Sequence, residues 1–529
     1  MTHYRKEKYE SSPLTEEQID RELKDYAKKE SKRLGLNAEQ WVEPINETFT
    51  KTQRKTTTLL VSGLTLVHDD LVAGALTGLG YKMNILPVAN NQAMQVGKEF
   101  GNRGQCNPTY FTVGNLVKFL IDLRDNQNLS VEEIVENYAF LTANACGPCR
   151  FGMYLTEYRK ALRDAGFEGF RVLQFQQTEG FSSEGGEEKG LDITKDFVWA
   201  VGRALLAGDV VNTLGYRIRP FEIEKGATDE VITLTRKKLV EAFINQTSIT
   251  KALKQCRKEF KKIKVDRSEP KPVVSIIGEF WAMTTEGDGN YHMHRFLENE
   301  GAQVEIQSIA SWLLYMIWEI KSDTKRRMKL QGYGTEITDV NHQNPAKLLF
   351  ILKIAEYSTK LLFYRFSKAI GLNNIKLADM DEIESLAKPF YNSELRGGEG
   401  HMEVGKLIHF VKDKQNHMTL SIKPFGCMPS ASVSDGIQSN VLARYPEAIY
   451  LPIETTGDGA VNVQSRVQMM LYKARKQSES EFDQALMEKN MTKKEFQDIL
   501  KVNKKWNQPL SRPPEKVAGL ASNLVYAIG

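Results

Sequence analysis

The stretch Val273-Val-Ser-Ile-Ile-Gly-Glu-Phe280 is a run of apolar and β-branched residues, which is typical of a strand buried on both faces. Helical spacing follows over 289–300 and ends at Gly301, and a second short apolar run covers 303–306. A strand, a helix and a second strand in this order form a βαβ unit, whose strands are parallel. This part of the chain therefore predicts a parallel sheet.

The same alternation occurs in two other parts of the chain. The expected strands lie at 57–66, 82–87, 418–422 and 448–451, and the expected helices at 69–79, 431–444 and 462–476. Repeated βαβ units build open sheets with helices on both faces. The sequence predicts an α/β protein with two doubly wound, parallel-sheet, Rossmann-like domains that face a cleft, together with additional helical segments.

The Pro-Lys run Glu269-Pro-Lys-Pro272 marks the expected boundary between these two domains. We expect an N-terminal helical arm over 1–55, because this segment is charged and carries helical spacing. The first α/β domain is expected over 56–270 and the second over 271–476. The remainder, 477–529, is expected to be a C-terminal helix and tail.

Composition is that of a globular protein, with 41% hydrophobic and 26% charged residues among 529. The 71 basic and 67 acidic residues nearly balance, so the charge gives no argument for nucleic acid or an anionic membrane as a partner. We see neither an uninterrupted apolar run long enough to span a bilayer nor an N-terminal apolar segment of the secretory type. We therefore expect a cytoplasmic protein, in which structural disulfides are rare.

Three short stretches around cysteine share one pattern. They are Gly104-Gln-Cys106-Asn-Pro108, Ala145-Cys146-Gly-Pro-Cys149 and Phe425-Gly-Cys427-Met-Pro429. Each has glycine next to the thiol and proline shortly after it, and each precedes an expected helix. Proline suits the first turn of a helix, where its missing N–H group is no loss. The free N–H groups of a helix start favour a bound anion.

Four thiols, those of Cys106, Cys146, Cys149 and Cys427, match the ligand count of one [4Fe–4S] cluster, which is anionic when held by thiolates. Cys256 lies among lysine and arginine in a helical stretch without this pattern, and we expect it not to be a ligand. The four thiols therefore predict an iron–sulfur site.

Two other interpretations of the cysteines stay open. Four cysteines also hold structural zinc, although such sites usually combine two local pairs. Cys146-Gly-Pro-Cys149 at a helix start is in addition the motif of thiol–disulfide oxidoreductases, in which the helix lowers the pKa of the first thiol. Against this, Ala145 occupies the place of the usual tryptophan in that motif.

Five ordered motifs resemble the 2-hydroxyacyl-CoA dehydratase-related and activase-related proteins. The motifs are Cys106-Asn-Pro, Ala-Cys146-Gly-Pro-Cys149-Arg-Phe-Gly, Gly278-Glu-Phe, Gly397-Gly-Glu-Gly-His and Pro424-Phe-Gly-Cys427-Met-Pro-Ser. The similarity covers about 57–476 and is closest to the C-terminal portion of long activase fusions, here as a separate polypeptide.

The resemblance implies a low-potential iron–sulfur protein that accepts electrons from an ATP-hydrolysing activase with its own cluster. It also implies anaerobic chemistry, a cluster bound by the four cysteines named above, and pairing with a second copy or a related subunit. Related double-cubane proteins use six cysteines in each chain, so four favour a single cubane. Dehydratase subunits use three and leave one iron open, so a fourth thiolate favours electron transfer over direct activation of substrate. A further alternative is a regulatory or assembly partner that has the same fold but does not turn over a substrate.

Overall fold

The structure is a computed structural model of the whole chain, and it describes residues 16–35, 49–143, 149–175, 190–191, 193–331, 344–395, 399–431 and 436–528. The chain divides into two units, Met1–Asn46 and Glu47–Gly529. The described part of the first unit contains helix α1 (Glu16–Arg33), in which Leu23 and Tyr26 are exposed. The second unit contains all the other helices and strands that the structure describes.

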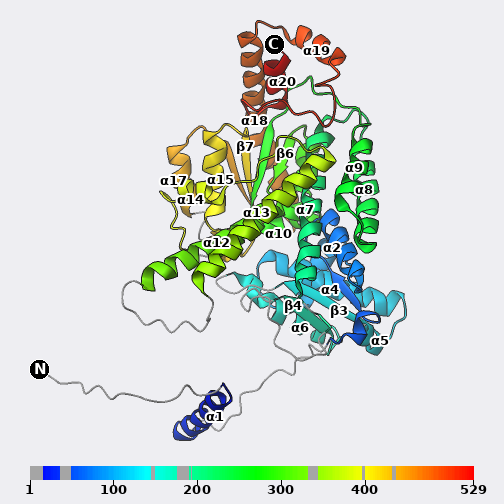
Figure 1. Cartoon of the computed structure of the whole chain (residues 1–529), viewed down its shortest axis with the longest axis vertical. Coiled ribbons are helices and arrows are strands. Elements are labelled where there is room, and N and C mark those ends of the chain that lie inside the picture. The colour runs from blue at the N-terminus through cyan, green and yellow to red at the C-terminus, as the bar shows by residue number, and fades with distance from the viewer. Residues whose placement is uncertain are drawn as a thin grey trace, which may run out of the picture. The chain divides into compact units, whose positions relative to one another are not determined.

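Two four-stranded sheets, in which every strand pair is parallel, form the framework of the second unit (Figure 1). The strand order is β2-β1-β3-β4 in the first sheet and β6-β5-β7-β8 in the second. The strands are β1 (Thr58–Val61), β2 (Lys82–Ile85), β3 (Tyr138–Ala143), β4 (Arg171–Phe175), β5 (Val273–Gly278), β6 (Gln303–Ile306), β7 (Met418–Pro424) and β8 (Tyr450–Thr455). The predicted α/β class with parallel sheets is confirmed.

Helices cover both sheets, because their central strands are apolar on both faces. Every residue of β1, β5 and β7 is buried, whereas the edge strand β2 alternates between exposed and half-buried residues. The helical elements of the first half are η1 (Thr52–Arg54), α2 (Leu66–Gly78), α3 (Asn91–Phe100), α4 (Asn107–Asn126), α5 (Val131–Asn137), η2 (Arg150–Met153), α6 (Tyr154–Asp164), α7 (Lys195–Ile218), η3 (Arg219–Phe221), α8 (Ala227–Ile244) and α9 (Ile249–Phe260).

The second half is richer in long helices. Its helical elements are α10 (Phe280–Thr284), η4 (Asp288–Asn290), α11 (Met293–Asn299), α12 (Ile309–Gln331), α13 (Pro345–Ile370), α14 (Met380–Ala387), α15 (His401–Lys412), α16 (Met428–Ser430), α17 (Gly436–Arg444), α18 (Ala460–Glu488), α19 (Lys493–Val502) and α20 (Leu520–Ile528). Between β6 and β7, the chain makes a long helical excursion over α12 to α15. This excursion supplies a wall of the site described in the next subsection.

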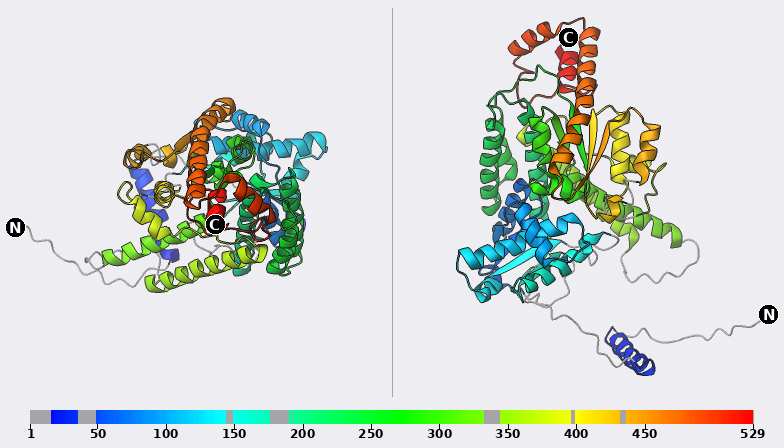
Figure 2. Two further views of the ribbon diagram at one scale, coloured as in Figure 1. Left: turned by 90° about the horizontal axis from the view of Figure 1, so that it is seen from above. Right: turned by 180° about the vertical axis from the view of Figure 1, so that it is seen from behind.

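The largest apolar core joins the two halves of this unit. It contains buried residues of α2, α7, α8, α9 and α13, and also of α18, α19 and α20 near the C-terminus. The last helices of the chain, orange to red in Figure 2, lie at one end of this unit. The expected ranges 56–270 and 271–476 each contain one complete sheet, but they share this helical core. The segment 477–529 contributes Phe482, Phe496 and Leu524 to it.

The carboxylate of Asp209 on α7 connects three helices. It accepts hydrogen bonds from the backbone N–H groups of Ile309 (2.9 Å) and Ala310 (2.7 Å), at the start of α12. Its Oδ1 also lies 3.4 Å from Nε2 of His68 on α2. Asp209 is buried, so these contacts satisfy a polar group that would otherwise be costly to remove from water.

Helices α3 and α4 approach each other closely at two glycines. A Cβ atom at Gly114 would overlap the carbonyl oxygen of Ala93, and one at Gly97 would overlap the carbonyl of Tyr110. This approach lets the helix pair insert Met94 and Phe111 into the core of the second sheet, where the Phe111 ring lies 5.5 Å from that of Trp281. The start of α4, which carries Cys106, is thereby held against the second sheet.

The described residues include one helical stretch, Lys195–Phe221, that is long and apolar enough to cross a membrane. Of its most apolar window, 61% is buried inside the fold. Burial of this kind fits a core helix of a soluble protein.

We expect Gly114→Ala to lower the free energy of unfolding by about 3 kcal/mol, because the added methyl group has to displace backbone atoms. Gly202→Ala is the matched control, since nothing lies within 4 Å of a Cβ at Gly202 and this position is inside helix α7. Alanine there should raise stability by about 0.5 kcal/mol or more. Urea denaturation followed by circular dichroism measures both changes, and equal effects would contradict the close approach.

We expect burial of the Asp69 carboxyl to lower the free energy of unfolding by an amount that depends on pH. Burial raises the pKa of this carboxyl from 3.8 to about 7. Between about pH 4 and pH 7, the unfolded chain loses this proton while the folded chain keeps it, so stability falls as the pH rises. Asp69→Asn removes this ionisation and keeps an acceptor for the Leu64 N–H group.

The difference in unfolding free energy between Asp69→Asn and the wild-type protein should therefore grow from about pH 4 and level off above about pH 7. Urea denaturation at a series of pH values measures it. A difference that stays constant over this pH range would show that the pKa of Asp69 is the same in the folded and in the unfolded chain.

Candidate thiol site

Three of the predicted ligand cysteines occupy equivalent local positions. Cys106, Cys149 and Cys427 each have extended backbone and form the N-cap of the following element, which is α4, η2 and α16 respectively. None of the three caps its helix with its side chain, so the sulfur atoms are available for other partners. Cys146 and the residues 144–148 around it lie outside the described residues.

The segments that carry these cysteines are joined to one another. The N–H group of Asn107 donates a hydrogen bond to the carbonyl oxygen of Phe425, at 2.9 Å. Gly426 has φ +77°, and a Cβ atom there would lie 3.3 Å from Cα of Cys106, so the two loops are in contact. The guanidinium of Arg150 donates to the carbonyl oxygen of Gly104. The structure thus brings the segments of Cys106, Cys149 and Cys427 together.

Hydroxyl groups surround two of the sulfur atoms. Sγ of Cys106 lies 3.0 Å from the hydroxyl oxygen of Tyr154 and 3.4 Å from that of Thr109. Sγ of Cys427 donates to the hydroxyl oxygen of Ser430, at 3.3 Å. Tyr154 is the first residue of α6 and lies five residues after Cys149. Sequence reasoning missed it, because its role depends on how α6 packs against α4.

Two glutamates complete the site, of which Glu399 is buried and Glu279 is half-buried. Glu279 follows β5 directly and caps α10, where its Oε2 accepts a hydrogen bond from the Ala282 N–H group at 2.8 Å. Oε1 of Glu399 accepts from the Phe280 N–H group at 2.6 Å. Glu279 is close enough to act electrostatically on all three thiols, and Glu399 acts on two of them, those of Cys149 and Cys427.

Both glutamates belong to glycine-containing motifs of the sequence, Gly278-Glu279 and Glu399-Gly400-His401, but the pattern alone gave them no role. Gly397 and Gly398 of the second motif lie outside the described residues. The sequence does indicate a ligand position at Gly278-Glu279, because this pair is expected at the end of a strand in an open parallel sheet, where ligands bind.

The site disfavours negative charge in the absence of a bound cation. Burial is the largest of the causes that raise the pKa of the Cys149 thiol to about 11, and the neighbouring Glu279, Glu399 and Cys106 also contribute. Burial also raises the pKa of Cys106 and of Cys427 above the ordinary value. The pKa of Glu279 and that of Glu399 are raised, again chiefly by burial. Metal ions reverse this preference, because a coordinating thiol is deprotonated by the cation.

Thiols with this arrangement fit soft metal ions such as iron or zinc better than calcium or magnesium. Cys106, Cys149 and Cys427 could hold such a metal, and Cys146 stands three residues before Cys149 in the sequence. Cys256 is separate from them, since it is buried in α9, where it hydrogen-bonds with Thr235 of α8.

A second group of metal-binding residue types lies on α14 and α15. Ligand atoms of Glu382, His409 and Asp413 lie within 4.8 Å of one another, and the two carboxylates are exposed. Nδ1 of His409 is 3.4 Å from the carboxylate of Asp413. A surface ion pair between these two residues explains why they lie close together.

No protein-family model matches this chain, and no curated protein matches it. The assignment of a function therefore depends on the site itself.

We expect the alkylation rate of Cys149 in metal-free protein to be still rising with pH at about pH 10, because the thiolate is the reactive form and the pKa is about 11. Iodoacetamide labelling followed by peptide mass spectrometry measures this rate at each pH. Glu279→Gln should shift the rise to lower pH, since it removes a negative charge beside the thiol. An inflection near pH 7 in the wild-type protein would instead indicate an activated redox cysteine.

Proposed function

We propose that this chain is an iron–sulfur protein of the 2-hydroxyacyl-CoA dehydratase-related type. It accepts low-potential electrons from a separate ATP-hydrolysing activase and passes them on for a difficult reduction or dehydration. The observation that carries this proposal is the convergence of the Cys106, Cys149 and Cys427 segments from two sheets, beside Glu279 and Glu399.

The proposed cofactor is one [4Fe–4S] cluster with Cys106, Cys146, Cys149 and Cys427 as ligands. Such a cluster supplies one-electron transfer, at a potential set by its hydrogen bonds, its net charge and its exposure to water. The chain's own residues control these properties. The Tyr154 hydroxyl contacts the sulfur of Cys106, which is buried, whereas Cys149 and Cys427 are half-buried.

Burial raises the pKa of Glu279 and of Glu399, which favours the neutral form of both carboxyl groups next to the thiols. In the protonated form, a carboxyl group is a hydrogen-bond donor and carries no charge that would oppose the gain of an electron. Glu279 is fixed by the Ala282 N–H group, and Glu399 by the Phe280 N–H group, so neither carboxyl needs to reorganise.

The architecture that fits this function is a pair of doubly wound, Rossmann-like domains across a cleft, with ligands from both. Movement of one domain relative to the other would then act on the site. The activase would use ATP hydrolysis to drive such a movement and would dock from the cytoplasm. A second copy or a related subunit completes the proposed assembly.

Anaerobic purification followed by iron and sulfide analysis tests the proposal. We expect about four irons and four sulfides per chain, and an electron paramagnetic resonance signal after reduction with dithionite. Cys427→Ser should lower the iron content and alter this signal. Cys256→Ser is the matched control, because it removes a buried thiol outside the site, and it should retain the full iron content.

A colourless protein with a titratable dithiol would contradict the proposal and favour thiol–disulfide chemistry at Cys146 and Cys149. Zinc in place of iron would favour a structural site. Electron transfer is tested separately by mixing the cluster-loaded chain with a reduced activase. Reduction of the chain should require ATP, and reduction at the same rate without ATP would contradict the proposed partnership.

A further inference from the structure

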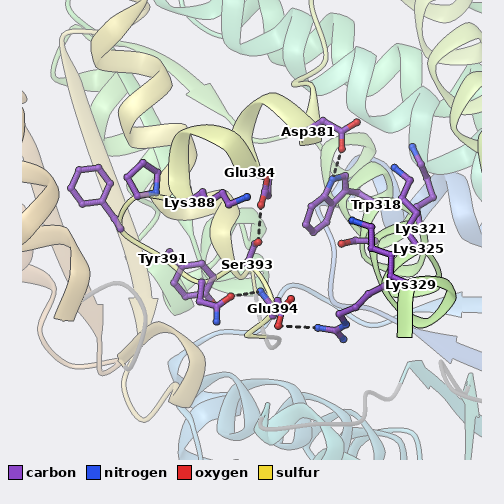
Figure 3. A pocket seen from close by; sticks show the side chains of 15 residues that line it. Trp318, Lys321, Lys325, Lys329, Asp381, Glu384, Lys388, Tyr391, Ser393 and Glu394 are labelled. Carbon is purple, nitrogen blue, oxygen red and sulfur yellow. Dashed lines mark hydrogen bonds and ion pairs between the residues drawn. The ribbon is translucent and has the colours of Figure 1, made fainter. Parts of the chain in front are cut away.

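A cavity of about 740 Å³ lies between α12 and α14, and the segment 388–394 closes it (Figure 3). Volumes of this order are typical of sites for small molecules. Lysines 321, 325 and 329 come from α12, and Lys388 comes from the opposite wall at the end of α14. With Arg326, five basic and three acidic side chains line the cavity.

The acidic side chains of the wall are engaged by other groups. Oδ1 of Asp381 accepts a hydrogen bond from the Trp318 indole N–H group at 2.7 Å, and Oε1 of Glu384 accepts from the Ser393 hydroxyl at 2.8 Å. The Glu394 carboxylate lies 3.4 Å from the guanidinium of Arg326 (Figure 3). Neutral donors thus orient Asp381 and Glu384, whereas Glu394 pairs with a cation.

The basic side chains fall into two groups. Lys321 pairs with Glu356 at 2.5 Å, and Arg326 pairs with Asp323 at 2.7 Å. Within the described part of the chain, no ion pair or side-chain hydrogen bond is formed by Lys325, Lys329 or Lys388. These three ammonium groups are therefore available to a ligand, and basic side chains outnumber acidic ones in the lining by five to three.

We propose that this cavity binds a small molecule carrying two or more phosphate groups. Ammonium groups on both sides of the space can contact separate phosphates, and charge-assisted hydrogen bonds of this kind are strong. The rings of Phe390 and Tyr391 lie in the same wall and offer an apolar surface to an organic part of the ligand. The site is distinct from the thiol site and does not depend on the proposed function.

The cavity and the thiol site nevertheless share a wall. The Trp318 ring lies 4.4 Å from that of His401, in a T-shaped arrangement, and His401 follows Glu399 by two residues. Gly400 has φ +52°, and a Cβ atom there would overlap the Tyr315 hydroxyl, so α12 packs directly on this segment. A ligand in the cavity would therefore sit behind the residues that position Glu399.

Isothermal titration calorimetry with inorganic pyrophosphate and with ADP, on the full chain at low salt, tests this proposal. We expect binding of one molecule per chain. Each of Lys325→Gln and Lys388→Gln should weaken it by about tenfold, because each removes one charged contact. Lys353→Gln is the matched control, since Lys353 is an exposed lysine of α13 that does not line the cavity, and it should bind as the wild-type protein does.

Tighter binding of ADP than of pyrophosphate would indicate that the nucleoside contacts the aromatic wall, whereas equal affinities would indicate a site for the phosphates alone. Both results support the proposal. Absence of heat with both probes at millimolar concentration would overturn it. Unchanged affinity in the double variant Lys325→Gln/Lys388→Gln would also overturn it, because the phosphates would then bind elsewhere.

Discussion

The buried carboxylate of Asp209 is the contact on which the arrangement of the two halves depends. It belongs to α7, which packs against α2 and β6, and it accepts the first N–H groups of α12. A buried carboxylate is stable only when it is fully hydrogen-bonded, so its partners on α12 are fixed in direction as well as in distance. The start of α12 is thereby set relative to α2 and α7, and α12 in turn supplies Tyr315 and Trp318 to the wall behind Glu399.

Both sheets use the same strand order, and this repetition explains why thiols from distant parts of the sequence meet. The Cys-Gly-Pro-Cys segment follows β3, and Cys427 follows β7, which are the third strands of the two sheets. In each half, a side chain in the segment after the first strand caps the following helix: Thr65, four residues after β1, caps α2, and Glu279, directly after β5, caps α10. Carboxyl ends of parallel strands share one edge of a sheet, so equivalent loops of the two halves can contribute to a single site.

Much of the framework was predictable from the sequence, because buried parallel strands are short apolar runs with few alternatives. The expected strands over 273–280, 418–422 and 57–66 correspond to β5, β7 and β1, with differences only at their ends. The contacts within the site were not predictable. The meeting of Cys106 with Phe425 and Gly426 depends on the insertion of α3 and α4 into the core of the other sheet. That insertion is made possible by the close approach at Gly97 and Gly114, which a single sequence does not distinguish from any other pair of helical glycines.

The charges of the two sites explain why they are separate. The thiols and the carboxyls of Glu279 and Glu399 offer a phosphate group no positive charge, so a phosphate-bearing ligand is not expected to bind to them. The cavity between α12 and α14 offers such a ligand a positive surface instead, on the other side of Trp318 and His401. If the thiol site holds the proposed cluster and the ligand accepts its electron, transfer has to cross this aromatic wall. If the ligand is not the acceptor, its binding still acts on the segment that holds Glu399, and hence on the proton beside the thiols.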